Sequence, residues 1–151
     1  MMGTISVRRE IPASASAVWD VLADFPNIAD WNGGVKTSYA TGEQTEGVGA
    51  TRHCDLAPTG GLEETIREWQ PEEKLVVSID STARLPIRTG LATFELSDDG
   101  GASSTRVALT YDYESKWGVI GTLMGGMVQK QLTKGFEGFL SDLSAAATAN
   151  S

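Results

Sequence analysis

The chemistry that this sequence could perform starts from one arginine and one glutamate, Arg52 and Glu64. Each stands in a stretch in which the residues at alternate positions are mostly apolar. Cys54 follows Arg52 by two positions, and Ile66 follows Glu64 by two positions. Because strand side chains alternate between two faces, both charges should point into the interior. A turn at 57–61 would place Glu64 opposite Cys54 and diagonal to Arg52, within reach of long side chains. We therefore expect an inward-facing pair that either fixes the sheet register, binds a ligand, or catalyses proton transfer with Glu64 and enolate stabilisation with Arg52.

A second group of candidates comes from the strands that follow. Tyr111 and Tyr113 fall on the apolar parity of one predicted strand, and Arg88 falls on that of the strand before it. A turn at 98–104 would set Arg88 near Tyr113 and add phenols and a second guanidinium to the interior. A β-bulge would instead turn Arg88 to solvent, and both tyrosines are otherwise common core aromatics. The sequence offers these three residues as ligand contacts, with core packing or solvent exposure as the alternative.

Large apolar side chains near the helical segments could complete the wall of a binding cavity. Trp31 and Trp117 stand at the ends of predicted helical segments, where they could form a rim. Met124 and Met127 lie in the last predicted helix, and their flexible thioethers could form an adaptable roof. An apolar pocket with a few convergent polar groups is what a small-molecule site requires. The same four residues could equally serve as core filler.

The remaining reactive residues narrow the chemistry. The single histidine, His53, has the opposite parity from Arg52, so we expect it on the outer face of the sheet beside Asp55. The single cysteine, Cys54, points inward, and we expect an inert buried thiol. One histidine and one cysteine cannot supply an intrachain disulfide or a zinc site built of Cys and His ligands. We therefore expect no metal and no cofactor.

The composition argues against several classes of partner. The chain has 151 residues, with 12 lysines and arginines against 20 aspartates and glutamates, and a net charge of −8. Nucleic-acid binding needs a basic face and a membrane surface attracts polybasic segments, so neither is expected here. The longest apolar stretch without a charge, residues 117–128, is too short to span a bilayer. With no apolar export signal in the first residues, we expect a cytoplasmic protein, and the sequence leaves its oligomeric state open.

The elements that must position these residues follow from periodicity and turn signals. A strand is predicted at Thr4–Ile11, then a helix from the N-cap Ser14 to residues 24–25, before Pro26, and a short helical segment at Asn27–Trp31. Six further strands separated by short turns predict antiparallel pairing, at Val35–Ala40, Val48–Leu56, Leu62–Trp69, Leu75–Asp80, Pro86–Leu96 and Thr105–Glu114. A long helix at Trp117–Ala147 follows, with several glycines in its first half. This order predicts a single α+β domain over residues 1–151, a curved seven-stranded antiparallel sheet around a long C-terminal helix.

Five motifs and the glycine-rich last helix carry a resemblance to a known family. The motifs are Ile11-Pro-Ala-Ser-Ala-Ser-Ala-Val-Trp19, Asp24-Phe-Pro-Asn-Ile-Ala-Asp-Trp31-Asn32, Gly47-Val-Gly-Ala-Thr-Arg52, Leu62-Glu-Glu64-Thr-Ile66-Arg-Glu68-Trp69 and Thr105-Arg-Val-Ala-Leu-Thr-Tyr111. Over nearly its whole length the sequence resembles the START-like (SRPBCC) superfamily, and within it the polyketide cyclase/dehydrase-like branch. The resemblance implies a helix-grip fold with a central cavity for lipids, hormones or aromatic metabolites. Only some members of this superfamily are enzymes.

Three functions remain open on these features. The first is binding of a small hydrophobic or aromatic metabolite, or a lipid, between the sheet and the last helix, as a carrier or sensor. The alternative is a polyketide cyclase/dehydratase-type enzyme, in which Glu64 transfers a proton and Arg52 or Arg88 stabilises an enolate. The third is an interaction protein that binds a partner through the outer face of the sheet. An open apolar cavity would favour the first two, and a filled core with an apolar outer patch would favour the third.

Overall fold

The order of elements is the one that the sequence predicts. The computed structural model describes residues 2–85, 87–98, 103–115 and 118–149, without the side chains of residues 2, 118–125 and 128. In this part of the chain the elements are β1 (Met2–Ile11), α1 (Ala15–Ala23), the 3-10 helix η1 (Phe25–Asp30), β2 (Val35–Ala40), β3 (Thr51–Leu56), β4 (Gly61–Gln70), β5 (Lys74–Ala83), β6 (Ile87–Asp98), β7 (Thr105–Ser115) and α2 (Gly118–Ala149).

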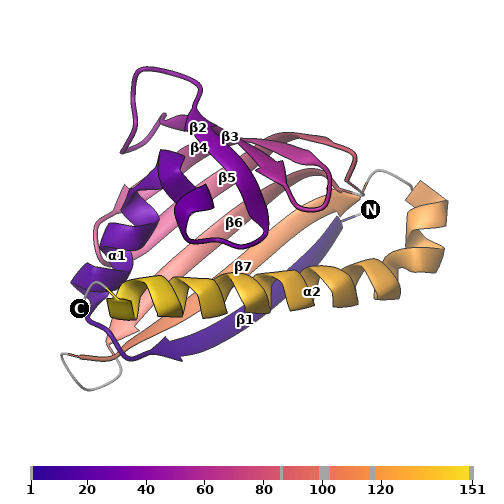
Figure 1. Cartoon of the computed structure of the whole chain (residues 1–151). Coiled ribbons are helices and arrows are strands. Elements are labelled where there is room, and N and C mark those ends of the chain that lie inside the picture. Colours follow the sequence, from indigo (N-terminus) through magenta and orange to yellow (C-terminus); the bar gives the residue numbers. More distant parts are fainter. Residues whose placement is uncertain (1, 86, 99–102, 116–117, 150–151) are drawn as a thin grey trace.

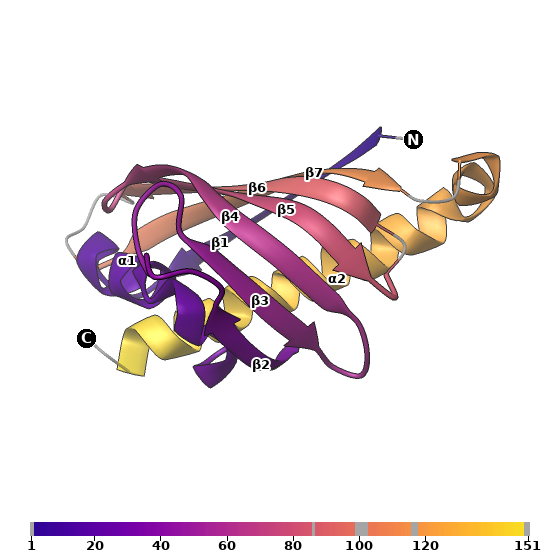
Figure 2. The same ribbon diagram turned by 90° about the horizontal axis from the view of Figure 1, so that it is seen from above.

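One antiparallel sheet contains all seven of these strands, in the order β1-β7-β6-β5-β4-β3-β2. Each neighbouring pair of strands is antiparallel, as the short predicted turns require. The sheet curves around α2, which lies across one of its faces, and α1 lies beside the C-terminal end of α2 (Figures 1 and 2). This arrangement is the expected helix-grip fold.

The first short helix begins after the predicted cap, Ser14, whereas the second begins two residues before the predicted Asn27. The Ser14 hydroxyl accepts a hydrogen bond from the backbone N–H of Ala17 at 3.1 Å, which satisfies one free donor at the start of α1. Pro26 disfavours α-helix in the residue before it, and the chain passes into η1 at Phe25. The buried face of α1 includes Trp19, whose ring meets that of Trp69 edge-on at 5.1 Å. These contacts fix the end of the sheet that η1 covers.

The core lies between the sheet and the C-terminal half of α2. Leu140, Leu143 and Ala147 of α2 are buried, and Phe136 and Phe139 are partly buried against the same cluster. The beginning of α2 projects beyond the ends of the strands (Figure 2). The second half of this helix is therefore the part that packs most closely on the sheet.

The strand that carries Arg52 begins later than predicted, at Thr51 rather than at Val48. Gly47 and Gly49 adopt positive φ angles of 80° and 99°, which favour glycine and form a turn here. The Gln44 side-chain amide donates to the Val48 carbonyl at 2.7 Å, and Val48 is 60% exposed. Apolar residues continue at alternate positions into this turn, at Val48 and Ala50. This is why the predicted strand began too early.

A single row of paired residues crosses the sheet from β2 to β1, and we call it the cross-sheet row. Its members are Ala40, Arg52, Glu64, Ile79, Gly90, Tyr113 and Gly3. The side chains of Arg52, Glu64, Ile79 and Tyr113 in this row are all buried. The row therefore has two charged residues, on β3 and β4. It also has an aromatic residue on β7, which lies between a glycine on β6 and a glycine on β1.

Candidate functional site

A cavity of about 270 Å³ lies between the inner face of the sheet and α2. Most of its wall is apolar, with Val77, Ile79 and Phe94 from the sheet and Leu132, Phe136 and Phe139 from α2. The polar side chains that border it include Asn32, Arg52, Glu64 and Tyr111. This volume stands near the lower end of the range of about 300–1,000 Å³ that is usual for small-molecule sites. An apolar cavity with a few polar groups is the arrangement that such a site needs.

The predicted inward-facing pair of Arg52 and Glu64 is confirmed. Arg52 Nε donates to Glu64 Oε1 at 2.9 Å, and the two residues are only 7% and 6% exposed. Arg52 Nη1 also donates to the backbone carbonyl of Phe25 at 2.9 Å, and the guanidinium lies 3.8 Å from the centroid of the Phe25 ring. Arg52 therefore joins β3 to both β4 and η1 and holds Glu64 in a fixed position.

The register of this pair differs from the predicted one. Arg52 is directly opposite Glu64, and Leu62 rather than Glu64 faces Cys54. The predicted turn included Gly60 and Gly61, whereas the Leu56 N–H donates to the Gly60 carbonyl at 2.9 Å and Gly61 is paired with Asp55 at the start of β4. Taking these two residues out of the turn shifts the partner by two positions and keeps every side chain on its expected face.

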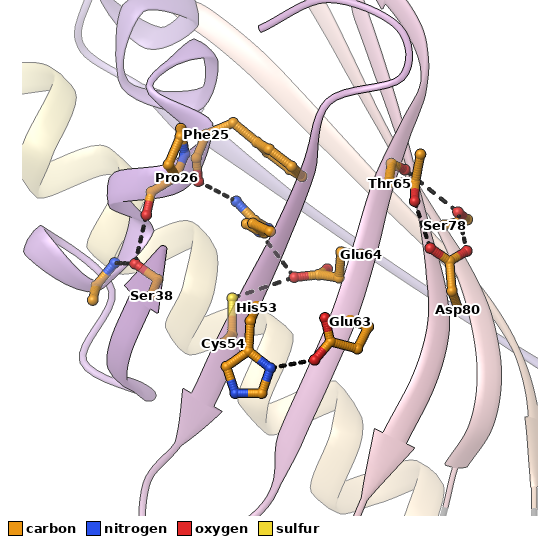
Figure 3. A network of polar contacts seen from close by, with 12 residues as sticks. Phe25, Pro26, Ser38, His53, Cys54, Glu63, Glu64, Thr65, Ser78 and Asp80 are labelled. Atoms are coloured by element: carbon orange, nitrogen blue, oxygen red, sulfur yellow. Dashed lines mark hydrogen bonds and ion pairs between the residues drawn. The ribbon is translucent and has the colours of Figure 1, made fainter. Parts of the chain in front are cut away.

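Glu64 has one oxygen in use and one that no described residue contacts through a hydrogen bond. Oε1 accepts hydrogen bonds from Arg52 and from the Cys54 thiol, whose Sγ lies at 3.5 Å (Figure 3). Within the part of the chain that the structure describes, no hydrogen bond reaches Oε2. A carboxylate oxygen is a strong acceptor, so Oε2 can accept a hydrogen bond from a ligand in the cavity.

The Cys54 thiol is not a nucleophile in this environment. Burial raises the pKa of Cys54 to about 12, and the nearby negative charge of Glu64 contributes in the same direction. The thiolate is the reactive form, so at neutral pH this cysteine stays protonated. This agrees with the inert buried thiol that strand parity predicts.

The two tyrosines of β7 point inward, and glycines on the neighbouring strands make room for their rings. A Cβ atom at Gly90 would lie 2.6 Å from Tyr111 Cζ, and one at Gly3 would lie 2.5 Å from Tyr113 Cζ. The two rings stack at 5.8 Å with an interplanar angle of 14°. Tyr111 borders the cavity and Tyr113 does not, so Tyr113 supports Tyr111 from behind.

The Tyr111 hydroxyl is a neutral hydrogen-bonding group. Burial raises the pKa of Tyr111, and the negative charge of Glu64 raises it further. The phenol therefore stays protonated at physiological pH and can donate or accept a hydrogen bond, but it does not supply a phenolate base. No side chain or backbone group among the described residues is hydrogen-bonded to this hydroxyl.

The prediction that Arg88 points into the interior is wrong. Ile87 pairs with Ser115 and Thr89 pairs with Glu114, which leaves Arg88 without a partner residue in a β-bulge. Its side chain is exposed. A bulge inserts one extra residue and reverses the parity on one side of it, which is the alternative that the sequence left open.

The predicted rim and roof are only partly present. Met127 is 70% exposed, so its prediction as a roof residue is wrong. Trp31 packs edge-on against Phe139 at 5.2 Å and borders a small adjoining hollow rather than the main cavity. Trp117 and the side chain of Met124 lie outside the described residues.

Sequence reasoning missed two polar residues of the cavity, Asn32 and Gln131 of α2. Asn32 is 8% exposed and borders the cavity from the connection between η1 and β2. Connections have no periodicity from which a facing direction could be read. The available signal was the position of Asn32 directly after Trp31 in a motif that carries the family resemblance.

His53 lies on the outer face of the sheet, as predicted. Its Nδ1 pairs with Glu63 (Figure 3). Its Nε2 pairs with Asp55 at 2.9 Å, and the Tyr39 ring lies 5.2 Å away. The hydrogen bonds of Asp55 and then of Glu63 raise the pKa of His53. The cluster is on the opposite face of β3 from Arg52 and takes no part in the cavity.

Within the described residues, no group of three or more His, Cys, Asp or Glu side chains is placed to hold a metal ion. No helix in the same part of the chain is long and apolar enough to cross a membrane.

The sheet that curves around a long helix, with a cavity between them, defines a START-like protein of the helix-grip class. Residues 2–148 match the model of the family described as polyketide cyclase/dehydrase and lipid transport. The chain therefore belongs to this family, which confirms the resemblance found in the sequence motifs. No curated protein matches the sequence.

Solved structures share the fold over almost the whole chain. A protein from Thermus thermophilus is 20% identical, with a TM-score of 0.83 over 99% of both chains. A START superfamily protein from Mycobacterium smegmatis is 17% identical, with a TM-score of 0.82 over 98% of this chain and 99% of that one. The Zhui aromatase/cyclase from a Streptomyces species is 14% identical, with a TM-score of 0.82 over 98% and 94%. At these identities the likeness shows a common fold.

Proposed function

We propose that this protein binds a compact hydrophobic or aromatic ligand in the cavity between the sheet and α2. The observation that supports this most strongly is Glu64, whose carboxylate Arg52 holds in an apolar wall with Oε2 facing no protein partner among the described residues. An ion pair that only fixed the sheet register would need no apolar space beside it. Burying a carboxylate is costly, so a hydrogen-bond donor on the ligand would gain a strong partner at Oε2.

The size of the cavity favours a small ligand over a two-chain lipid. Its volume of about 270 Å³ equals the liquid volume of about nine water molecules at about 30 Å³ each. One aromatic ring or two fused rings fill such a space, with Phe94 and Phe136 available for contact with their faces or edges. The neutral Tyr111 hydroxyl offers a second polar contact.

Native mass spectrometry of the freshly purified protein, followed by denaturing extraction, tests whether a ligand is already bound. Calorimetric titration with 2-naphthol, a two-ring compound with one hydroxyl donor, then tests the proposed contact with Glu64. In the variant Glu64→Gln, Arg52 will hold the amide oxygen and the NH₂ group will face the cavity. We expect affinity for 2-naphthol to fall by about tenfold or more, because a hydrogen bond to a charged group contributes about 1.5–3 kcal/mol.

Exposed Glu95 of β6 provides the matched control for this titration. Glu95→Gln removes the same charge from the surface and should leave the affinity unchanged. The proposed function is contradicted if the wild-type protein carries no adduct and binds no 2-naphthol. It is equally contradicted if Glu64→Gln binds as tightly as Glu95→Gln.

A second candidate function, ring closure of a poly-β-keto chain, is favoured by the placement of Glu64 and Tyr111. Gly90, which the Tyr111 ring covers, is two strands from Glu64 in the cross-sheet row, or about 10 Å. Glu64 Oε2 could take a proton from a carbon between two carbonyls, while the Tyr111 hydroxyl donates to the enolate oxygen. The enolate carbon would then bond to a second carbonyl carbon, whose oxygen receives the proton, and loss of water would follow.

In this alternative Arg52 acts as a positioning residue. Its Nε and Nη1 are engaged by Glu64 and by the Phe25 carbonyl, so the role that the sequence gave to an arginine passes to Tyr111. Turnover of a linear poly-β-keto thioester tests the idea. We expect Glu64→Gln to abolish cyclisation and Tyr111→Phe to lower its rate. Absence of turnover by the wild-type protein, with 2-naphthol binding intact, would contradict the enzymatic role and leave the binding role.

A further inference from the structure

The side-chain amide of Asn32 has one group in use and one that faces no protein partner. Its Oδ1 accepts a hydrogen bond from the backbone N–H of Gly34 at 2.9 Å. Because a backbone N–H can only donate, the amide atom that faces it must be the oxygen, and Nδ2 is left to point elsewhere. Across the described residues, no acceptor is hydrogen-bonded to Nδ2.

The connection that carries Asn32 is held in place from several sides. The Asn32 backbone N–H donates to the Ile28 carbonyl at 2.9 Å, and its own carbonyl accepts from the N–H of Val35 at 3.1 Å. The Gly33 N–H donates to Asp142 of α2 at 2.9 Å. These bonds fix the backbone of the connection, and Asn32 is only 8% exposed at the border of the cavity. Nδ2 has no protein acceptor among the described residues and keeps accessible surface, so it can donate to an acceptor that a ligand brings into this cavity.

We propose that Asn32 is a ligand-binding residue whose Nδ2 donates a hydrogen bond to an oxygen atom of the ligand. This inference rests on the proposed binding function and gives it a chemical class. Glu64 Oε2 requires a donor on the ligand and Asn32 Nδ2 requires an acceptor, while the wall between them is apolar. A neutral aromatic compound with both a hydroxyl and a carbonyl group, a hydroxyaryl ketone, meets all three requirements.

Two probes that differ only in the acceptor test this inference. Calorimetric titrations compare 2-naphthol with 6-acetyl-2-naphthol, which adds a carbonyl to the same rings. We expect the acetyl group to raise the affinity of the wild-type protein by about 3- to 10-fold, the usual effect of one neutral hydrogen bond. In Asn32→Asp an oxygen still accepts from Gly34, but the group that faced the ligand has no proton to donate. The gain should disappear, while the affinity for 2-naphthol stays within about twofold.

Two further variants make the test specific. Asn27→Asp adds the same charge at an exposed position of η1 and should keep the full gain from the acetyl group. Asn32→Ser keeps a short acceptor for the Gly34 N–H without added charge and should lose the gain, which covers the case in which the aspartate variant does not fold.

The possible results separate this inference from the proposed function. If the wild-type protein binds 2-naphthol but gains nothing from the acetyl group, the role of Asn32 is overturned and binding stands. The role is also overturned if Asn32→Ser or Asn32→Asp, folded as judged by circular dichroism, keeps the gain. If the wild-type protein binds neither probe, the proposed function itself is overturned, and the role of Asn32 with it.

Discussion

Replacing Arg52 by methionine should destabilise the protein far more than the loss of an ordinary surface ion pair. The change removes the hydrogen bonds from Nε to Glu64 and from Nη1 to the Phe25 carbonyl, both 2.9 Å long, and the contact with the Phe25 ring at 3.8 Å. It leaves Glu64, which is 6% exposed, as an unpaired carboxylate in an apolar wall. Breaking one side of such a buried pair costs about 3–5 kcal/mol. For a domain of this size the melting temperature should fall by about 6–20 °C.

Urea unfolding followed by far-ultraviolet circular dichroism measures this loss, and two further variants give it meaning. Arg67→Met breaks the exposed pair of Arg67 and Asp80, joined at 3.1 Å, and should cost at most about 1 kcal/mol. The double variant Arg52→Met/Glu64→Met replaces both buried charges by apolar side chains and should recover most of the loss. The reasoning is refuted if Arg52→Met costs no more than Arg67→Met, or if the double variant is less stable than Arg52→Met alone.

Three other features make measurable predictions. Gly90→Ala should destabilise the protein by about 1–3 kcal/mol, because the new Cβ would lie 2.6 Å from Tyr111 Cζ. Gly138→Ala, whose Cβ would meet nothing within 4 Å, should stabilise α2 by about 0.5–1 kcal/mol. Shifts of the same sign in the melting temperatures of the two variants would contradict this contrast. The raised pKa of His53, caused by Asp55 and then Glu63, means that the folded protein binds this proton more tightly than the unfolded chain does. That stabilisation is complete below about pH 6.5 and is lost as the pH rises through the raised value, so His53→Gln should lose more stability in urea at about pH 6 than at about pH 9. An equal loss at both would count against the cluster. Cys54, whose pKa burial and Glu64 raise to about 12, should react with Ellman's reagent only as fast as the protein unfolds, and a fast native reaction would disprove its inertness.

Strand parity predicted the facing of the site residues because it depends only on alternation along one strand. Arg52, Glu64 and Tyr111 point inward and His53 points outward, as the pattern of apolar neighbours indicated. The partner of a residue across the sheet depends also on the length of the turn. Counting both Gly60 and Gly61 in the turn, although they lie opposite Leu56 and Asp55, therefore misplaced the partner of Glu64 by two positions without changing its face.

The features that sequence reasoning missed arise where parity does not apply. The bulge at Arg88 is set by how β6 pairs with β7, and nothing in the alternation of β6 itself marks it. The exposure of Met127 depends on how α2 lies against the sheet, which the periodicity of the helix does not reveal. Asn32 lies in a connection, and its facing is fixed by hydrogen bonds to Gly34 and Ile28 that only the folded chain brings together.

The cross-sheet row would make preference for the proposed ligand modular. Ile79 of β5 separates the charged end of the row, Arg52 and Glu64, from Gly90 of β6, over which the ring of the neighbouring residue Tyr111 lies. Substitutions about 7–10 Å apart that share no partner usually add in free energy. A descendant of this protein, or a designer, can therefore retune the phenolic end for a new ligand while the ion pair keeps its geometry, and can combine separately selected changes at the two ends without having to find them together.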